Sequence, residues 1–231
     1  MIFNSVKKEY LRVNMELFRP PTPPIEFITF DQQTDGERVL RKHFSGMELA
    51  VPITIRSDKR IEELKQDLSK WLVHSEPKKL QFVDMPNMYY LAFYQSMELD
   101  ERINFAKGVL TFYLPEAYRF GQTRVLQIDS SDKTHMVLGQ KETHWNSKTI
   151  FKQETTNYSI ELLTGKRITL HYTFGVGDTL EIDSRLRKIV LNGVVRMPLL
   201  SLASEWFKVQ PGENQIRSSY STEVTYTEKF Y

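Results

Sequence analysis

The stretch Gly175–Arg196, which reads GVGDTLEIDSRLRKIVLNGVVR, decides the fold class of this chain. Short runs rich in β-branched residues stand on either side of Asn192-Gly193. Because both residues of this pair tolerate positive φ, an Asn-Gly step between such runs is the strongest short-range signal of a β-hairpin. We therefore predict two antiparallel strands joined by a tight turn, in a segment that carries no catalytic motif.

The C-terminal stretch, SEWFKVQPGENQIRSSYSTEVTYTEKFY over residues 204–231, extends this pattern. Pro211-Gly212 predicts a turn after a strand at Trp206–Val209, and two more short strands follow. The strands predicted upstream, from about residue 150, are Tyr158–Leu163, Arg167–Phe174 and Thr179–Asp183. The second half of the chain is therefore predicted to be an all-β antiparallel sandwich.

The first half carries the one convincing helix, predicted at about residues 58–73. Apolar residues recur there every three or four positions, which is the spacing of a helix with one buried face. Ser57 or Asp58 is suited to be the N-cap, and the acidic first turn favours the helix dipole. The apolar stripe comprises Ile61, Leu64, Leu68, Trp71 and Leu72.

Strand patterns flank this helix, so we predict an α+β first half in which the helix lies across an antiparallel sheet. The fold class is thus mainly β, with one domain at residues 1–125 and a second at residues 126–231. The break is expected within residues 121–145, where a polar Ser-Ser-Asp-Lys run interrupts the pattern. The strands predicted for the first half are Ala50–Arg56, Lys79–Val83, Tyr89–Met97 and Gly108–Leu114.

Composition excludes several classes of function. The 231 residues include no cysteine, which rules out disulfides, thiolate metal sites and a cysteine nucleophile. Each half of the chain carries a formal charge of +1, without the clustered cations expected of a surface that grips nucleic acid. No signal peptide opens the sequence, and no apolar run is long enough to span a membrane. We expect a protein that is made and assembled in a cytoplasm.

Side chains with chemical potential are scattered, and we predict no catalytic residue, metal site or cofactor. The five histidines fall in five different elements or loops, with no pair at metal-ligand spacing. Asp178 and Asp183 are the obvious carboxylate pair, but five steps along one strand span about 16 Å and place the two on opposite faces. We interpret Asp178 as a turn cap and Asp183 as a strand-end residue that bonds the following loop.

Trp145, in the loop-like ETHWNSK, is predicted to be the most exposed tryptophan. With His144 and Asn146 beside it, it is a candidate partner contact or sugar-stacking platform. A purely structural role is the stronger interpretation. The proline-rich run Arg19–Pro24 suits a polyproline ligand less well than a stiff entry into the first sheet, with prolines blunting an edge strand.

The ordered motifs of the chain resemble those of phage distal tail proteins, the baseplate hub subunits of long, flexible-tailed phages of Gram-positive hosts. The resemblance rests on the set rather than on any one motif. In chain order, the motifs are RPPTPPIEF, IEELKQDLSKWL, PKKLQFVDMPNMYYLAFY, GVLTFYLPEAYRFG, GD-x-L-x-ID, VLNG, S-x-W-F-x-V-x-PG-x-N and VTY.

The resemblance implies a tail-tube-like first domain that forms a homo-hexameric ring and a galectin-like second domain, with the last strand (about 223–231) able to return to the first. It implies a structural virion protein, assembled in the host bacterial cytoplasm. Such a hub joins tail-tube to tail-tip proteins, carries receptor-binding proteins and lets DNA pass through its lumen without specific binding. It is not an enzyme and has no membrane partner. The charged segment DQQTDGERVLRKHFSG (31–46) is either a solvated hairpin or a neighbour contact or lumen surface, through Asp35, Arg38, Arg41 and Lys42.

Two alternatives belong to other classes. The first is a carbohydrate-binding module that recognises host cell-surface polysaccharide through Trp145 and its neighbours. The second is a hydrolase, which the sequence disfavours because it has no cysteine, no G-x-S-x-G motif and no usable carboxylate pair.

Overall fold

A computed structural model describes residues 1–32 and 35–231 of the chain. It divides into two compact units: residues 1–120 with Tyr231, and residues 121–230. Gln33 and Thr34, inside the segment 31–46, lie outside the described residues. None of the helices in the described part of the chain is long and apolar enough to cross a membrane.

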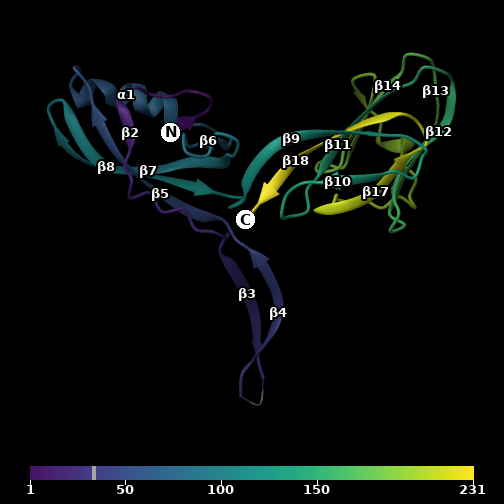
Figure 1. Ribbon diagram of the computed structural model, residues 1–231, viewed down its shortest axis with the longest axis horizontal. Coiled ribbons are helices and arrows are strands. Elements are labelled where there is room, and N and C mark those ends of the chain that lie inside the picture. The colour runs from purple at the N-terminus through teal and green to yellow at the C-terminus, as the bar shows by residue number, and fades with distance from the viewer. Residues whose placement is uncertain (33–34) are drawn as a thin grey trace. The chain divides into compact units, whose positions relative to one another are not determined.

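The first unit is built on a six-stranded antiparallel sheet with the order β1-β6-β7-β8-β5-β2 (Figure 1). Its longest ladder pairs β5 with β8 over ten consecutive residue pairs, from Met47↔Leu114 to Arg56↔Phe105. The strands are β1 (Ile2–Phe3), β2 (Leu11–Val13), β5 (Met47–Arg56), β6 (Lys78–Gln81), β7 (Tyr90–Arg102) and β8 (Phe105–Leu114).

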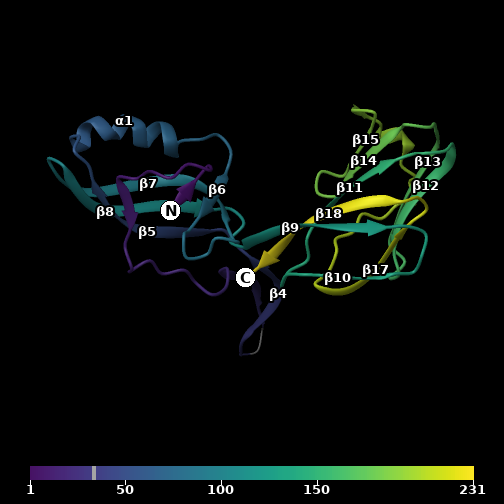
Figure 2. The same ribbon diagram turned by 45° about the horizontal axis from the view of Figure 1, so that its top comes forward.

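The helix α1 (Ile61–Leu72) lies over one face of this sheet, as Figure 2 shows. All five residues of the predicted apolar stripe are buried, so that part of the prediction is confirmed. The predicted N-cap is wrong. The helix begins after Arg60, which caps it without a side-chain hydrogen bond, while Ser57 Oγ accepts from Lys59 N (3.1 Å) before the helix starts.

One glycine permits the close pairing of β7 and β8. Gly108 is paired with Leu99, and a Cβ at this position would lie 1.8 Å from the backbone oxygen of Glu98. No side chain fits there without moving the neighbouring strand.

A separate two-stranded ribbon, β3 (Ile25–Asp31) and β4 (Glu37–Phe44), leaves the six-stranded sheet (Figure 1). Every residue of β3 is exposed, and so are the first six of β4. The ribbon therefore adds almost nothing to the core of its unit.

The second unit is an antiparallel sandwich of two sheets, with the orders β10-β17-β12-β13 and β16-β15-β14-β11-β18-β9. Asn192 and Gly193 have φ of 50° and 79° and turn the chain between β15 and β16, which confirms the predicted hairpin. The strands are β9 (Arg119–Ile128), β10 (Thr134–Val137), β11 (Trp145–Ile150), β12 (Thr155–Leu162), β13 (Arg167–Phe174), β14 (Thr179–Asp183), β15 (Lys188–Leu191), β16 (Val194–Val195), β17 (Gly212–Ser218) and β18 (Thr222–Phe230).

Two sequence-based predictions for this unit are wrong. Trp145 is not in a loop: it begins β11 and is 1 % exposed. The run 206–209 is not a strand, because its only ladder contact is the isolated bridge between Val209 and Thr143. A short 3₁₀ helix, η1 (Met197–Leu199), precedes this coil.

The two units have separate hydrophobic cores. The members of the first core all fall between Met1 and Ala117, and those of the second between Ile128 and Tyr226. The final strand β18 pairs with β11 and neighbours β9 in the second unit, and only Tyr231 groups with the first.

Candidate functional site

The ribbon β3–β4 is the strongest candidate for a binding surface on the first unit. It exposes large apolar side chains that a solvated hairpin would not need: Phe27 is 55 % exposed and Phe30 64 %. Other apolar residues exposed on the ribbon are Ile25, Ile28, Val39 and Leu40. Contiguous exposed apolar surface is typical of protein–protein contact sites.

The predicted cations Arg38, Arg41 and Lys42 lie directly across the ribbon from its apolar residues. The register pairs Phe27 with Lys42, Ile28 with Arg41 and Phe30 with Arg38. All three cations are exposed, and none forms an ion pair within the described residues. Asp35 is also exposed, in the turn. The structure thus brings the four predicted residues together on one element.

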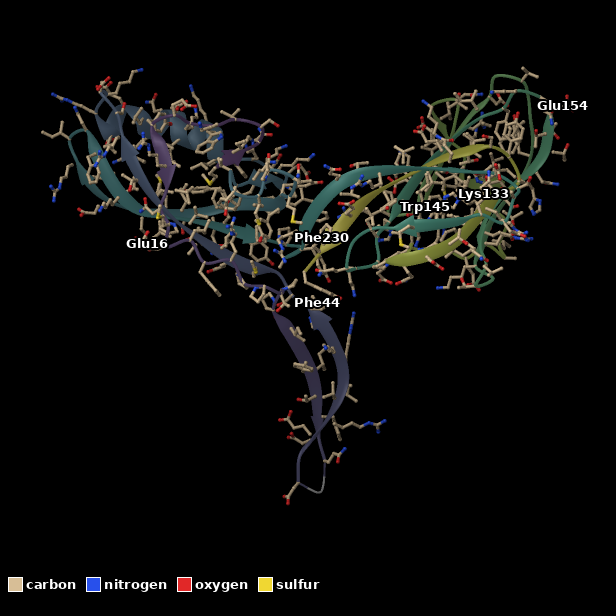
Figure 3. The ribbon with its side chains drawn as sticks, in the orientation of Figure 1. Glu16, Phe44, Lys133, Trp145, Glu154 and Phe230 are labelled. Carbon is tan, nitrogen blue, oxygen red and sulfur yellow. The ribbon has the colours of Figure 1, made fainter. Side chains whose placement is uncertain are left out.

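An aromatic cluster holds the base of the ribbon. Phe44 ends β4 (Figure 3), and its ring centroid lies 5.7 Å from that of Tyr118 and 5.3 Å from that of Tyr231. Arg119 Nε donates to the backbone oxygen of Tyr231 (2.6 Å). The last residue of the chain is therefore part of the support from which the ribbon extends.

The predicted contact around Trp145 is not assembled. The Trp145 Nε1–H donates to the backbone oxygen of Phe207 (3.0 Å), and the ring packs 5.0 Å from the ring of Phe207. The indole faces the core and offers no surface for stacking, while Asn146 next to it is exposed. His144 is partly buried, and burial together with the nearby cations Lys208 and Lys229 lowers its pKa.

Asp178 and Asp183 serve the turns, as the sequence predicts. Asp178 accepts from Gly175 N and from Asn192 Nδ2, both at 2.8 Å. Asp183 Oδ1 accepts from the backbone N–H groups of Arg185 and Leu186, both at 2.8 Å. Across residues 1–32 and 35–231, no three His, Asp or Glu side chains are grouped to hold a metal ion.

Two family models match this chain, one on each unit. Residues 6–114 match a phage tail protein RIFT-related domain, and residues 138–230 match the C-terminal domain of a siphovirus-type tail component. The distal tail protein of Bacillus phage SPP1 is 27 % identical over 205 residues, which cover 85 % of this chain and 81 % of the relative. The chain belongs to the phage distal tail protein family.

Solved structures of distal tail and baseplate proteins share the fold of this family member. The crystal structure of SPP1 Dit, described as a paradigm of the hub adsorption apparatus in phages that infect Gram-positive bacteria, matches with a TM-score of 0.88 at 20 % identity. That match covers 100 % of this chain and 98 % of SPP1 Dit. A chain of the phage P2 baseplate in its activated, Ca-bound conformation matches with a TM-score of 0.55 at 9 % identity, covering 95 % and 90 % of the two chains.

Sequence reasoning about this distal tail family member found the ribbon's charges but not its exposed apolar side chains. A signal for them was present, because Ile25, Phe27 and Ile28 follow the proline run in a pattern without strict alternation. A strand that is apolar on both faces is buried only when other elements cover both faces. The described residues of the first unit cover neither face of most of the ribbon, so its apolar side chains are exposed.

Proposed function

We propose that this chain is the hub of a phage tail, in which six copies form a ring through their first units. The ring would join tail-tube to tail-tip proteins, with a tail-tube-like first domain and a galectin-like second domain that carries receptor-binding or other baseplate proteins. DNA would pass through the lumen without specific binding. The role is structural and not enzymatic, in virions assembled in the host bacterial cytoplasm.

The ribbon β3–β4 is the observation that carries this proposal. It combines exposed aromatic and aliphatic side chains with three cations that have no ion-pair partner among the described residues. A ribbon of this kind gains stability when a neighbouring copy covers it, because burial removes apolar surface from water and supplies counter-charges. When each copy contacts the next through two different patches, the copies form a closed ring if the rotation from one copy to the next is a whole fraction of a full turn.

The native mass of the purified chain tests the proposal. Light scattering after size exclusion is expected to give six times the mass of 27.2 kDa, with rings in negative-stain images. If the chain alone is monomeric, co-expression with the tail-tube and tail-tip proteins of its phage is expected to yield the ring. A chain that stays monomeric in both experiments contradicts the proposal.

The ribbon's part is tested by the double variant Arg38→Glu/Arg41→Glu. It is expected to lose the ring and remain folded, because both side chains are exposed and unpaired. The matched control is Arg102→Glu/Lys107→Glu, two exposed cations near the turn between β7 and β8, which should leave the ring intact. Equal loss of the ring in both variants would assign the effect to net charge and not to the ribbon.

The alternative functions lose the residues on which they depended. Trp145 cannot stack on a sugar because its ring is buried. Asp178 and Asp183 each hold a turn, so neither is free to act as the acid or nucleophile of a glycosidase.

A further inference from the structure

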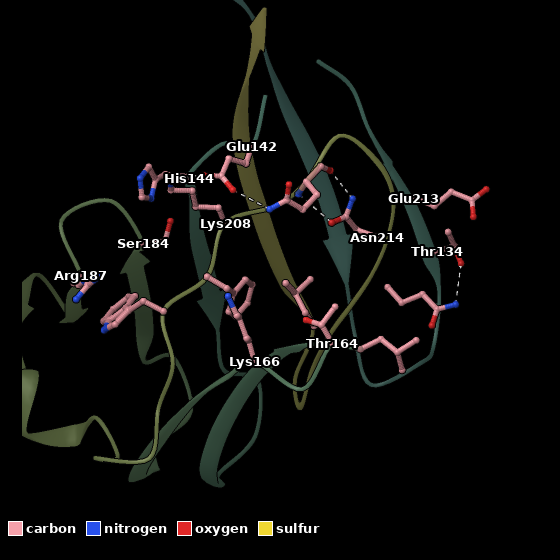
Figure 4. A pocket seen from close by; sticks show the side chains of 16 residues that line it. Thr134, Glu142, His144, Thr164, Lys166, Ser184, Arg187, Lys208, Glu213 and Asn214 are labelled. Carbon is pink, nitrogen blue, oxygen red and sulfur yellow. Dashed lines mark hydrogen bonds and ion pairs between the residues drawn. The ribbon is translucent and has the colours of Figure 1, made fainter. Parts of the chain in front are cut away.

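The second unit contains a pocket whose lining residues all lie within that unit. The turns from β12 to β13 and from β14 to β15, together with the coil 206–210 and the start of β17, enclose about 670 Å³. This volume falls within the range of small-molecule binding sites, about 300–1,000 Å³. Its wall combines one tryptophan with several charged and amide side chains (Figure 4).

Trp206 supplies an aromatic surface to this pocket. Trp71 and Trp145 are 6 % and 1 % exposed, whereas Trp206 is only partly buried against the core of its unit. The indole N–H of Trp206 has no hydrogen-bond acceptor among the described residues. Both buried tryptophans do have one. A polar aromatic edge without a protein partner at the wall of a pocket is suited to a ligand that offers an apolar face and an oxygen acceptor.

One wall of the pocket is fixed by a network of hydrogen bonds. Glu142 accepts from Lys208 Nζ (2.7 Å) and from Gln210 Nε2 (3.0 Å). Asn214 donates to the backbone oxygens of Gln210 (2.7 Å) and Gly212 (3.0 Å). The hydrogen bond from Lys208 lowers the pKa of Glu142, so its carboxylate is ionised at neutral pH and has lone pairs left to accept from hydroxyl groups.

Two cations of the wall are not used within the protein. Lys166 and Arg187 are exposed and have no ion-pair partner among the described residues. Figure 4 shows Arg187 at one end of the pocket and Glu213 at the opposite end. Because Lys208 already balances Glu142, Arg187 and Lys166 each leave a positive charge on the wall that an acidic group would neutralise.

We propose that this pocket binds an acidic saccharide, whose sugar ring stacks on Trp206 and whose carboxylate or phosphate pairs with Arg187 or Lys166. Hydroxyl groups of the sugar donate to Glu142, and a hydroxyl that extends beyond the edge of the indole accepts from its N–H. An acidic sugar brings an apolar ring face, several hydroxyl donors and one anionic group in a single unit. The site does not depend on the ring of copies proposed above, since every residue named lies in one chain.

Titration followed by tryptophan fluorescence tests this site, because Trp206 is the tryptophan that a ligand can reach. The full-length protein is titrated separately with tetragalacturonate, glucose 1-phosphate, maltotetraose and inorganic phosphate. Saturable quenching is expected with tetragalacturonate or glucose 1-phosphate, and the arm that responds identifies the acidic group. Maltotetraose is expected to bind at least tenfold more weakly, and the acidic ligand should bind more weakly as salt is raised.

The variant Lys166→Gln/Arg187→Asn should weaken acidic-saccharide binding by roughly tenfold or more, equivalent to about 1.4 kcal/mol, because it removes the charge-assisted contacts to the anionic group. Asn is chosen because Arg187 has φ of 52°, a conformation that Asn tolerates. The control Lys148→Gln/Lys188→Gln removes two exposed cations outside the pocket wall and should bind like wild type.

Three results would overturn the proposal. The first is no saturable response to either acidic saccharide. The second is that maltotetraose or inorganic phosphate binds as tightly as the acidic saccharide, and the third is that the control variant weakens acidic-saccharide binding as much as Lys166→Gln/Arg187→Asn does. A circular-dichroism melt of each variant establishes that it is folded. Trp206→Phe keeps an aromatic face but loses the reporting tryptophan, so its binding is measured by calorimetry, where it should retain part of the affinity. Because the binding is measured on the purified chain whatever its mass, failure here leaves the hub proposal standing, and failure of ring assembly leaves this one standing.

Discussion

The two buried tryptophans each fix a segment that has few backbone ladder contacts of its own. Trp71 on α1 donates its indole N–H to the backbone oxygen of Phe3 (2.9 Å), and Trp145 donates to that of Phe207 (3.0 Å). A buried indole must find an acceptor, and a buried carbonyl must find a donor. Trp145 therefore holds the coil 206–210, one wall of the pocket, against β11.

Trp145→Phe is expected to lower the free energy of unfolding by about 1–3 kcal/mol, since it removes a buried hydrogen bond and leaves the Phe207 oxygen without its donor. Urea unfolding followed by circular dichroism measures this, as the tryptophan signal changes with the substitution. Trp206→Phe is the matched control, and its effect should stay below about 1 kcal/mol because no protein partner is lost. Similar losses of unfolding free energy in the two variants would show that the hydrogen bond from Trp145 to Phe207 does not account for the effect.

A second residue-scale contact ties the N-terminal segment to α1. Asp67 accepts from Lys8 Nζ at 2.6 and 2.7 Å and from Tyr10 Oη at 2.6 Å. The hydrogen bond from Lys8, followed by that from Tyr10, lowers the pKa of Asp67. A carboxyl whose pKa is lower in the folded state stabilises the fold above its unfolded pKa, near 4, and loses this contribution as the pH falls through the folded pKa.

Asp67→Asn is accordingly expected to reduce the free energy of unfolding by about 1 kcal/mol at pH 7, a value kept low because the side chain is half exposed. The difference from wild type should shrink as the pH is lowered from 5 to 2. Unfolding by urea at a series of pH values measures it. Tyr10→Phe, which keeps the ion pair, should give a smaller loss at pH 7, and a difference from wild type that does not vary with pH would contradict the assignment.

The error over Trp145 shows what sequence patterns miss at this scale. The buried positions of β11 alternate as Trp145, Ser147 and Thr149, so two of the three inward side chains are polar. Thr149 is accommodated by hydrogen bonds to Tyr158 (3.4 Å) in the next strand and to Thr222 (2.8 Å), which is 73 residues further along the chain. Alternation of apolar and polar residues is the signal by which a half-buried strand is found from sequence. In β11 this alternation is absent, because hydrogen-bond partners on other strands allow polar side chains to occupy buried positions.

At the scale of elements, the sequence predicts α1 and most strands because their burial is periodic. The stripe on α1 and the alternation along β5, buried at every second residue, are local patterns that need no knowledge of partners. The coil 206–210 shows the same kind of local pattern but does not form a strand. Its apolar residues Trp206, Phe207 and Val209 resemble a strand, yet they are held by an indole, one isolated bridge and the pocket network.

The pairing of β7 with β8 depends on Gly108, and Gly108→Ala is expected to destabilise the protein by roughly 2 kcal/mol or more. The added methyl would meet the Glu98 backbone oxygen at 1.8 Å, and backbone in the middle of a sheet cannot move aside cheaply. Thermal unfolding measures it. Gly175→Ala is the control, since its Cβ would meet only Asp178 Oδ2 at 3.8 Å, and a comparable loss there would remove the steric explanation.

At the scale of the whole molecule, the separate cores predict that the second unit folds alone. The buried apolar residues of each unit form their own cluster, and all backbone ladders of the sandwich lie within residues 119–230. A fragment of residues 121–230 should therefore give a cooperative thermal transition and bind the acidic saccharide as the full chain does. At about 110 residues it has the size of a common independent domain.

The control fragment, residues 129–230, differs only by the loss of most of β9, and it should not fold cooperatively. Its loss uncovers the edge of β18 and removes Ile128 from the core. It also takes away Arg124, whose Nε lies 2.7 Å from Glu228 Oε1, a carboxylate only 8 % exposed. The loss of this apolar burial and of these strand contacts removes a large share of the stability of a domain this small. Circular dichroism melts of the two fragments decide the matter: if both melt alike, β9 is dispensable, and if neither melts cooperatively, the second unit depends on the first.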